Sequence, residues 1–429
     1  MIRRDFFKTA AKGWGSLAAL GAVLTPHTAQ ARTLKLPDQR DTHDEEFWSA
    51  VRQQFPLTHD RVYLNTGGLG ASPTVSIQAL KDKVDELEEI SETGHTAELW
   101  QTTKERAGLA LGCDPGEIAF TRNTTEGANI VCNGLPLQRG DEVITSSHEH
   151  VGNTMTWLAR QKREGIILKV FDPDTQSARN TLDRIESLIT PRTRAISVSH
   201  VTCSTGQILP VRQIGQLIAD RDIYYFVDGA QAPGMMPVDV HEIGCHAYAT
   251  SGHKWLLGPK GTGLLYVRRD ALDLIDARFV GAYSGTGHFD IRTGEFQFHP
   301  TAQRYEYGTV SAPLIAGLGA AFDFSLQIGL DAIWRHNHAL AAALKDGLND
   351  LGARVLSPQR ADEHSSMITF KLDGVGYKTL KPFLTEKFNL RTRGIYEGGL
   401  DGVRISLHLY NSLADVGRVL EGVEAAQKL

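Results

Sequence analysis

The chain has few cysteines, no cluster of basic residues and little sequence that could cross a membrane. Its four cysteines, at positions 113, 132, 203 and 245, show neither close pairing nor the spacing of metal ligands. A protein of 429 residues has enough core to do without disulfides, so we expect buried free thiols. Acidic residues outnumber basic ones, which argues against nucleic-acid binding. Beyond the first 31 residues no run approaches the about 20 apolar residues of a membrane span.

The first 31 residues have the order of an export signal. Arg3 and Arg4 precede two phenylalanines, a modest apolar run over Gly13–Leu24, and the small-residue exit Ala29-Gln30-Ala31. A basic start, an apolar middle and an A-x-A end are typical of a secretion signal, and adjacent arginines point to the twin-arginine route. We expect the twin-arginine translocation machinery as a partner, cleavage near Ala31, a periplasmic location and no membrane association after cleavage. An ordinary secretion signal, or a chance pair of arginines, is the alternative.

The mature chain would keep 398 residues, enough for two domains with a sizeable core. Its net charge would be −8, because the signal carries four basic residues and one acidic residue within a total of −5. Neither a repeat of fixed period nor a low-complexity tract interrupts it.

Short apolar runs alternate with helical stretches over much of the chain. The runs are rich in Val, Ile and Tyr and are often apolar on both faces, as buried parallel strands are. We expect strands at Ile118–Thr121, Glu142–Ser146, Ile166–Phe171, Ala195–Val201, Tyr224–Val227, Ala247–Ser251 and Gly263–Val267. The predicted fold class is therefore α/β, with a mostly parallel central sheet in a large domain over residues 71–312.

The C-terminal part has a different pattern. We expect a long helical stretch over about Pro313–Leu351, strands at Ser366–Leu372, Leu390–Thr392 and Val403–Leu409, and a final amphipathic helix opened by Asn411-Ser412. This order indicates a smaller α+β domain over residues 313–429. We expect the N-terminal segment 32–70 to pack against it.

An acid and a lysine carry the strongest chemical signal. Asp228 ends the β-prone run Ile223–Val227, and Lys254 follows 26 residues later in Ser251-Gly252-His253-Lys254-Trp255. Residues beyond the carboxyl ends of parallel strands face the ligand crevice. A pyridoxal phosphate (PLP) enzyme needs a lysine for its Schiff base and a carboxylate that keeps the pyridine nitrogen protonated. Taken alone, Asp228 would be a turn residue and Lys254 a solvated lysine, but the pair favours a PLP site.

Two further segments fit such a site. Thr121–Gly127 follows a strand and opens a helix, and hydroxyls with free N–H groups at a helix start bind anions. A plain helix cap would explain the same residues. Arg404 lies inside an otherwise apolar strand and suits a substrate carboxylate, with Arg391 and Arg393 on the preceding strand. The alternative is an arginine on an edge strand with its head in water.

The segment His148-Glu149-His150 also follows a predicted strand. Two histidines and an acid suggest a metal site, and hence a metal-dependent hydrolase, but their spacing matches no zinc pattern. We favour His150 as a ring stacked on a flat cofactor, and we expect no metal. The metal-dependent hydrolase and a catalytically silent binding protein are kept as rival classes.

Together these segments resemble the class V aminotransferases, a branch of the fold-type I PLP enzymes. The resemblance is strongest to the isopenicillin-N-epimerase-like group and the neighbouring cysteine desulfurases. It rests on Tyr63–Gly68, Thr124–Gly127, Glu149-His150, His200-Val201, Asp228–Gln231, Ser251–Lys254 and Tyr305–Thr309. It implies the PLP-transferase fold of type I over nearly all of the mature chain. It also implies a homodimer with the site near the subunit interface, which the loop Gly281–Gly287 would reach from the partner.

The resemblance assigns roles to the matching residues. Lys254 forms the Schiff base, Asp228 pairs with the ring nitrogen, His150 stacks on the ring and Gln231 reaches the ring hydroxyl. The phosphate is held by Thr124, Thr125, Ser251 and His253. Arg404 receives the carboxylate of the substrate, a small amino-acid-like molecule. Beyond the roles that the resemblance assigns, we also predict Arg391 and Asn65 as substrate-binding residues.

Two departures from the desulfurase pattern limit the predicted chemistry. Desulfurases carry a nucleophilic cysteine on a loop just after the position of Arg391, whereas residues 393–399 include none. Cys203 also stands where desulfurases place an asparagine near the ring hydroxyl. We therefore predict an exported PLP-dependent aminotransferase or epimerase-like enzyme acting on an amino acid or an amino-acid-like group. The alternatives are a lyase or desulfurase-like enzyme, or one that modifies a siderophore side chain, since an exported member of this group takes part in pyoverdine maturation.

Overall fold

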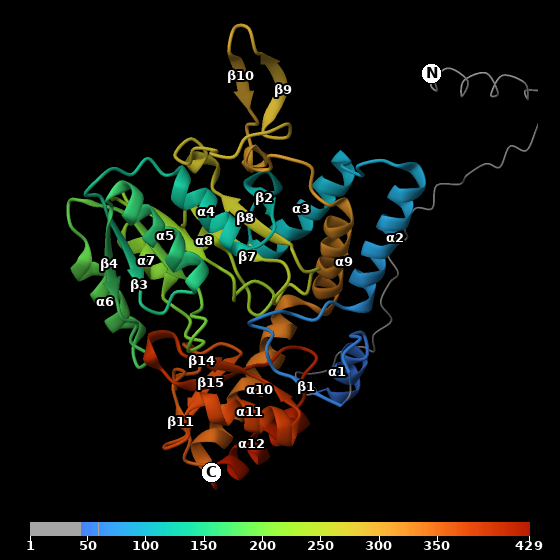
Figure 1. Cartoon of the computed structure of the whole chain (residues 1–429), viewed down its shortest axis with the longest axis vertical. Helices are drawn as coiled ribbons and strands as arrows, with labels where there is room; N and C mark the ends of the chain where they lie inside the picture. Colours follow the sequence, from blue (N-terminus) through green and yellow to red (C-terminus); the bar gives the residue numbers. More distant parts are fainter. Residues whose placement is uncertain (1–43, 59) are drawn as a thin grey trace, which may run out of the picture. The chain divides into compact units, whose positions relative to one another are not determined.

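The computed structural model describes residues 44–58 and 60–429. The predicted export signal and its cleavage site lie outside these residues. Within the described part, two sheets organise the chain (Figure 1).

The larger sheet, called the central sheet, has seven strands in the order β2-β8-β7-β6-β5-β3-β4. They are β2 (Ile118–Thr121), β3 (Glu142–Ser146), β4 (Ile167–Phe171), β5 (Thr193–Ser199), β6 (Tyr224–Asp228), β7 (Ala247–Ser251) and β8 (Gly263–Val267). Strand β8 runs in the direction opposite to the other six strands. The predicted α/β fold with a mostly parallel sheet is confirmed.

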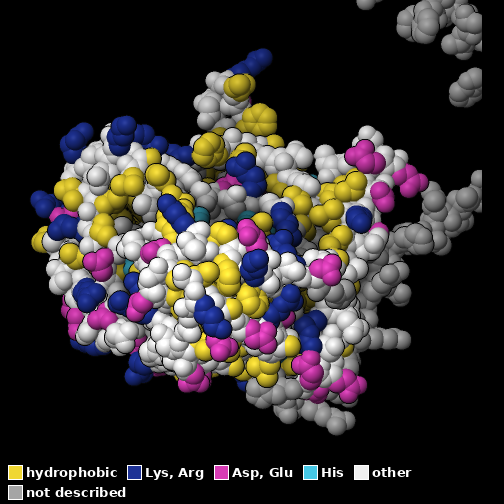
Figure 2. All heavy atoms as spheres, turned by 60° about the horizontal axis from the view of Figure 1, so that its bottom comes forward, with side chains coloured by type: hydrophobic (Ala, Val, Ile, Leu, Met, Phe, Trp, Pro, Cys, Tyr) yellow, Lys and Arg dark blue, Asp and Glu magenta, His cyan; other side chains and the backbone are white. Residues whose placement is uncertain are grey.

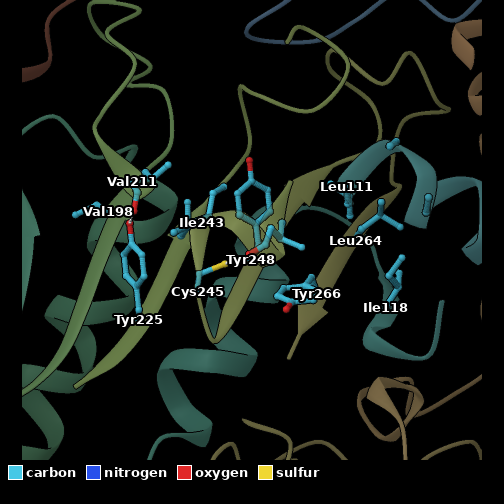
Figure 3. Packing of buried hydrophobic residues seen from close by; sticks show 14 of the residues in the cluster. Leu111, Ile118, Val198, Val211, Tyr225, Ile243, Cys245, Tyr248, Leu264 and Tyr266 are labelled. Atoms are coloured by element: carbon cyan, nitrogen blue, oxygen red, sulfur yellow. Dashed lines mark hydrogen bonds between the residues drawn. The ribbon is translucent and has the colours of Figure 1, made fainter. Parts of the chain in front are cut away.

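Helices cover both faces of the central sheet because its strands are apolar on both faces. In β6, Tyr225 and Val227 belong to one apolar cluster and Tyr224 and Phe226 to the other. Figure 3 shows the first cluster, in which the Tyr225 hydroxyl donates to the Val211 carbonyl at 2.9 Å. The first face packs on α3 (Ala97–Leu111), α6 (Ala178–Leu188), α7 (Val211–Leu217) and α9 (Ala312–Ile328), and the second on α4 (Thr124–Gly134) and α5 (Val151–Glu164). The short helix α8 (Val240–Ile243) also packs on the first face, and α2 (Thr74–Ile90) packs against α9.

The smaller sheet, called the C-terminal sheet, is antiparallel with the order β11-β12-β15-β14. Its strands are β11 (Arg354–Val355), β12 (Met367–Lys371), β14 (Arg393–Ile395) and β15 (Gly402–Ser406). It shares an apolar core with α10 (Leu330–Asp350), α11 (Tyr377–Phe388) and α12 (Leu413–Ala426). The N-terminal strand β1 (Val62–Tyr63), which follows α1 (Glu45–Arg52), pairs in parallel with β13 (Leu390–Arg391). The domain boundaries at residues 70 and 312 stay predictions.

The structure differs from the sequence prediction in two places. The long helical stretch over about 313–351 is two helices, α9 and α10, separated at Gly329, whose φ is 94°. The predicted glycine-rich loop ends inside a hairpin of β9 (Gly285–Asp290) and β10 (Glu295–Phe298), which projects from the top of the view in Figure 1. Its reach toward a partner subunit stays a prediction. Among the described residues, no single helix has the length and hydropathy of a membrane span. Only α9 and α10 together would meet that test, and they are bent by 77°.

Candidate active site

Polar residues lie where the strands of the central sheet end. Asp228 ends β6, Ser251 ends β7, and His148–His150 follows β3. Because these strands are parallel, their carboxyl ends meet at one edge of the sheet, where such sheets bind ligands. Figure 2 shows a hollow near the middle of one face, with histidines visible inside it and lysine and arginine side chains along its rim.

Lys254 is buried in the turn that follows β7. The Gly70 backbone lies against it so closely that a Cβ built on Gly70 would be 1.9 Å from the Lys254 carbonyl oxygen. Burial lowers the pKa of the Lys254 amine to about 8, although the Asp228 carboxylate opposes this shift. At a pH below both this value and the ordinary 10.5 of a lysine, the neutral fraction of the Lys254 amine is roughly 300-fold higher than that of an ordinary lysine. Lys254 is therefore suited to act as a nucleophile and a base.

Asp228 provides a buried carboxylate near this lysine. Its Oδ1 accepts the Ala230 N–H at 2.9 Å, the only hydrogen bond to its carboxylate among the described residues. Burial raises the pKa of Asp228, whereas the Ala230 N–H and the positive charge of Lys254 lower it. A protonated ring nitrogen would supply the counter-charge that a buried carboxylate requires.

The start of α4 offers an anion site next to the lysine. Thr124 Oγ1 hydrogen-bonds to Ser251 Oγ at 2.7 Å. Asn123 caps the helix by accepting the Glu126 N–H at 2.9 Å, so the helix cap is present, and the positive end of the helix dipole still favours an anion here. Thr125 is exposed, and a Cβ built on Gly152 would lie 2.5 Å from its Oγ1. His253 is half-buried, and its Nδ1 bonds to a backbone carbonyl at 3.0 Å. The chemistry of this donor set fits a phosphate.

His150 caps α5 and is held in one orientation. Its Nδ1 accepts the Gly152 N–H at 3.1 Å, so the neutral ring carries its proton on Nε2. Burial lowers the pKa of His150 to about 4, and the charges of Lys254 and Arg393 contribute. A neutral, fixed imidazole suits stacking against a flat ring.

Gln231 connects two segments of the site. Its Nε2 donates to the Gly67 carbonyl at 3.0 Å, and its Oε1 accepts the Trp255 indole N–H at 2.8 Å. The structure therefore shows Gln231 holding the Gly67 turn beside the lysine segment. The predicted contact with the ring hydroxyl stays a prediction.

Arg404 brings the C-terminal sheet into the site. It is fully buried, and its Nη1 donates to the Cys203 carbonyl at 2.6 Å while Nη2 donates to Asn65 Oδ1 at 3.2 Å. A Cβ built on Gly67 would lie 2.8 Å from Nη2, so only glycine leaves room there. Burial lowers the pKa of Arg404 to about 10, which keeps it cationic at neutral pH. The alternative of an edge-strand arginine in water is wrong, because β15 lies between β12 and β14.

The structure places Arg393, rather than Arg391, next to Arg404. Arg391 pairs in register with Tyr63, and its Nη1 donates to the Thr392 carbonyl at 2.6 Å. Arg393 is the direct cross-strand partner of Arg404 and forms an ion pair with Glu397. The sequence places both arginines two residues apart in one apparent strand, and only the change from β13 to β14 at Thr392 separates them.

Glu149 is a site residue for which the sequence predicts no role in cofactor or substrate binding. Its fully buried carboxylate accepts from Ser146 Oγ at 2.6 Å, Ser199 N at 3.0 Å, Ser199 Oγ at 2.7 Å and Asn153 Nδ2 at 3.0 Å. Burial and the charge of the neighbouring Asp228 raise the pKa of Glu149, whereas the hydrogen bonds from Ser146 and Ser199 lower it. Its place beside His150, after a predicted strand, is the signal in the sequence that points to it.

The described residues do not form the metal site that His148, Glu149 and His150 suggested. Within residues 44–58 and 60–429, no three His, Cys, Asp or Glu residues gather closely enough to hold an ion. His148 instead lies near the turn at Gly398, and its Nδ1 is buried without a hydrogen-bond partner in the described part of the chain. The four cysteines form no disulfide, and three of them are buried, as predicted; Cys113 is half-buried.

A buried lysine, a buried acid at a strand end and hydroxyls at a helix start together fit PLP. A model of the class-V aminotransferases matches residues 85–419. The chain belongs to the class-V aminotransferase family. It is a PLP-dependent enzyme of that family, and pyridoxal phosphate is its cofactor.

Individual relatives differ in their reactions. A probable cysteine desulfurase of Methanothermobacter thermautotrophicus is 28% identical over 400 residues, which cover 87% of this chain and 96% of the relative. The isopenicillin N epimerase of Amycolatopsis lactamdurans is 26% identical over 409 residues, which cover 89% and 99%. The solved structure of a variant of the cystine C–S lyase C-DES, with glycine covalently linked to its PLP, has a TM-score of 0.79. It is 28% identical, and the match covers 87% of this chain and 98% of C-DES.

Proposed function

We propose that this enzyme is exported and acts on an amino acid or an amino-acid-like group, as an aminotransferase or an epimerase. The observation that carries the proposal is the meeting of Lys254, Asp228 and Arg404 at one buried place. Between them they offer a base, a counter-charge for the cofactor ring and a donor for a carboxylate.

Each group has a separate task. Bound PLP supplies an aldehyde that condenses with amines and a ring that takes up electrons. Arg404 orients the substrate, because its Nε has no partner among the described residues and is free to donate to a carboxylate oxygen. The Lys254 Nζ, with its lowered pKa, accepts the Cα proton and returns it. Asp228 holds the proton of the ring nitrogen in place.

The cysteines argue against a persulfide at the position just after Arg391, where desulfurases carry their nucleophile. Residues 393–399 include no cysteine. Burial raises the pKa of Cys113, Cys132, Cys203 and Cys245, which keeps these thiols protonated and unreactive. A lyase that needs no enzyme thiol is a second candidate, supported by the similarity to C-DES.

The experiment is covalent trapping of the cofactor. We expect purified holoenzyme to absorb in the visible range, and borohydride reduction followed by peptide mapping to place the label on Lys254. Lys254→Ala abolishes the band and the label, while Lys260→Ala, six residues away and also partly desolvated, keeps both. Label on another lysine would contradict the assignment. A screen of amino donors by spectral shift then separates transamination, epimerisation and β-elimination by their products.

We also propose a periplasmic homodimer. The paired Arg3 and Arg4 support export by the twin-arginine route. Phe289 and Ile291 on the β9–β10 hairpin are 71% and 91% exposed, which supports a protein partner at that position. Replacing both arginines with lysine should retain the protein in the cytoplasm, and light scattering of the mature enzyme should give twice the chain mass.

A further inference from the structure

The site holds more positive charge than one substrate carboxylate requires. Arg393 on β14 and Arg404 on β15 are direct partners across antiparallel strands. Side chains at directly opposed positions project from the same face of a sheet and lie close together. The two guanidinium groups therefore share one side of the C-terminal sheet, on which Arg404 reaches the Cys203 carbonyl and Asn65.

The charge of Arg393 acts on the catalytic groups themselves. It lowers the pKa of Lys254, His150 and Arg404, in each case together with other causes. Such effects fade with distance in a solvated protein, so Arg393 lies close to the place where the substrate would bind. Its side chain keeps 24% of its surface exposed, unlike that of Arg404.

A carboxylate of the chain itself already occupies Arg393. Glu397 forms the ion pair with it, and Glu397 Oε2 also accepts the Tyr396 N–H at 3.1 Å. Glu397 opens a short 3-10 turn with Gly398 and Gly399, both at positive φ. A turn of this kind is short and has few backbone bonds, so Glu397 can move away when a competing anion arrives.

We propose that Arg393 binds a second acidic group on the substrate, and that Glu397 holds this position until that group displaces it. Resting on the proposed function, this assigns the substrate class: amino dicarboxylates, or amino acids whose side chain ends in an anion. Arg404 takes the α-carboxylate and Arg393 takes the distal one. The displaced Glu397 side chain, now 14% exposed, moves into solvent, where a carboxylate is stable.

The test compares isosteric substrates that differ only in distal charge. Dissociation constants come from the visible absorbance change of the holoenzyme titrated with L-glutamate or L-glutamine, and with L-aspartate or L-asparagine. We expect the wild type to bind one of the acids about 10–100-fold more tightly than its amide, as hydrogen bonds to charged groups allow.

Two variants separate binding from a purely structural ion pair. Arg393→Gln should weaken binding of the acid far more than binding of its amide, and so bring the two dissociation constants close together. Glu397→Gln should widen the preference for the acid, because the competitor of Arg393 is gone. Arg179→Gln, which removes one partner of the exposed ion pair with Asp183 on α6, is the matched control and should change neither constant.

Several results would overturn the proposal. They are equal binding of acid and amide by the wild type, equal weakening of both by Arg393→Gln, or an unchanged preference in Glu397→Gln. If neutral amino acids shift the spectrum but acids have no advantage, the proposed function stands and the substrate class falls. If no amino acid shifts the spectrum of a holoenzyme labelled at Lys254, both fall together.

Discussion

At the residue scale, the site depends on charged side chains that are kept out of water. Lys254 and Arg404 are both buried, and each has its pKa lowered, while burial raises that of Asp228. Buried charges are costly unless they are paired or held by hydrogen bonds. Each of these groups is therefore sensitive to changes in its neighbours.

The lowered pKa of Lys254 predicts how the apoenzyme takes up its cofactor. Only the neutral amine attacks an aldehyde, so the rate of PLP uptake should rise with pH and level off above about 8. The same pKa shift also makes the stability of the apoenzyme depend on pH. Between about 8 and the ordinary lysine value the unfolded chain binds more protons, so the stability of the apoenzyme gains from this group as pH rises through that window. Stopped-flow absorbance measures the rate; a rate still climbing at pH 10 would contradict the shift.

Glu149 gives a second prediction at this scale. Glu149→Gln places an amide NH₂ where Ser199 N–H or Asn153 Nδ2 now donates, so one buried donor loses its acceptor. We expect the free energy of unfolding to fall by about 1–3 kcal/mol, measured by urea denaturation. Glu186→Gln, on an exposed face of α6, should leave it unchanged. No loss in Glu149→Gln would show that the carboxylate is protonated in the folded enzyme.

At the scale of elements, the break between α9 and α10 is decided by backbone conformation. Gly329 has φ 94° and ψ 123°, a conformation that residues with a Cβ rarely adopt. A Cβ there would meet only Ala332 Cβ at 3.9 Å, so crowding is not the reason for glycine. The turn between the helices, and with it the approach of the C-terminal sheet, depends on this conformation.

Gly329→Ala should therefore destabilise the protein by about 1–3 kcal/mol through backbone strain alone. The matched control is Gly417→Ala in α12, where φ is ordinary and no atom lies within 4 Å of the added Cβ. That change should be neutral or stabilising by about 0.5–1 kcal/mol, because alanine is the better helix former. Thermal unfolding of both variants distinguishes strain from a general intolerance of alanine.

At the scale of the whole molecule, the cofactor and the substrate depend on different parts of the fold. The predicted PLP residues follow strands of the central sheet, whereas Arg404 belongs to the C-terminal sheet. The two parts are joined at consecutive carbonyls: Cys203 O accepts from Arg404, and Ser204 O accepts from Thr369 Oγ1 at 2.7 Å. Thr369 is also the cross-strand partner of Arg404 on β12.

This arrangement predicts that substrate binding is lost before cofactor binding. Thr369→Val keeps the volume but removes the hydroxyl that donates to Ser204, so the position of Arg404 relative to the central sheet loosens. We expect a rise of about 5–10-fold in the dissociation constant of an amino-acid ligand, as about 1 kcal/mol implies, with the PLP absorbance unchanged. Thr379→Val on the exposed side of α11 serves as the control. If Thr369→Val also lost the PLP absorbance, cofactor binding and substrate binding would not depend on separate parts of the fold.

The sequence by itself determined the features that depend on local pattern. The strands of the central sheet are recognisable because both faces are buried, so that apolar residues run on without interruption. Asp228 and Lys254 are recognisable because the first ends such a strand and the second follows one. Only the tertiary structure decided which residues from distant segments meet: Glu149 beside Asp228, Gln231 on Gly67, and Arg393 instead of Arg391 beside Arg404. Periodicity shows which face of an element is buried, but the register between elements is set by packing and hydrogen bonds formed across the whole chain.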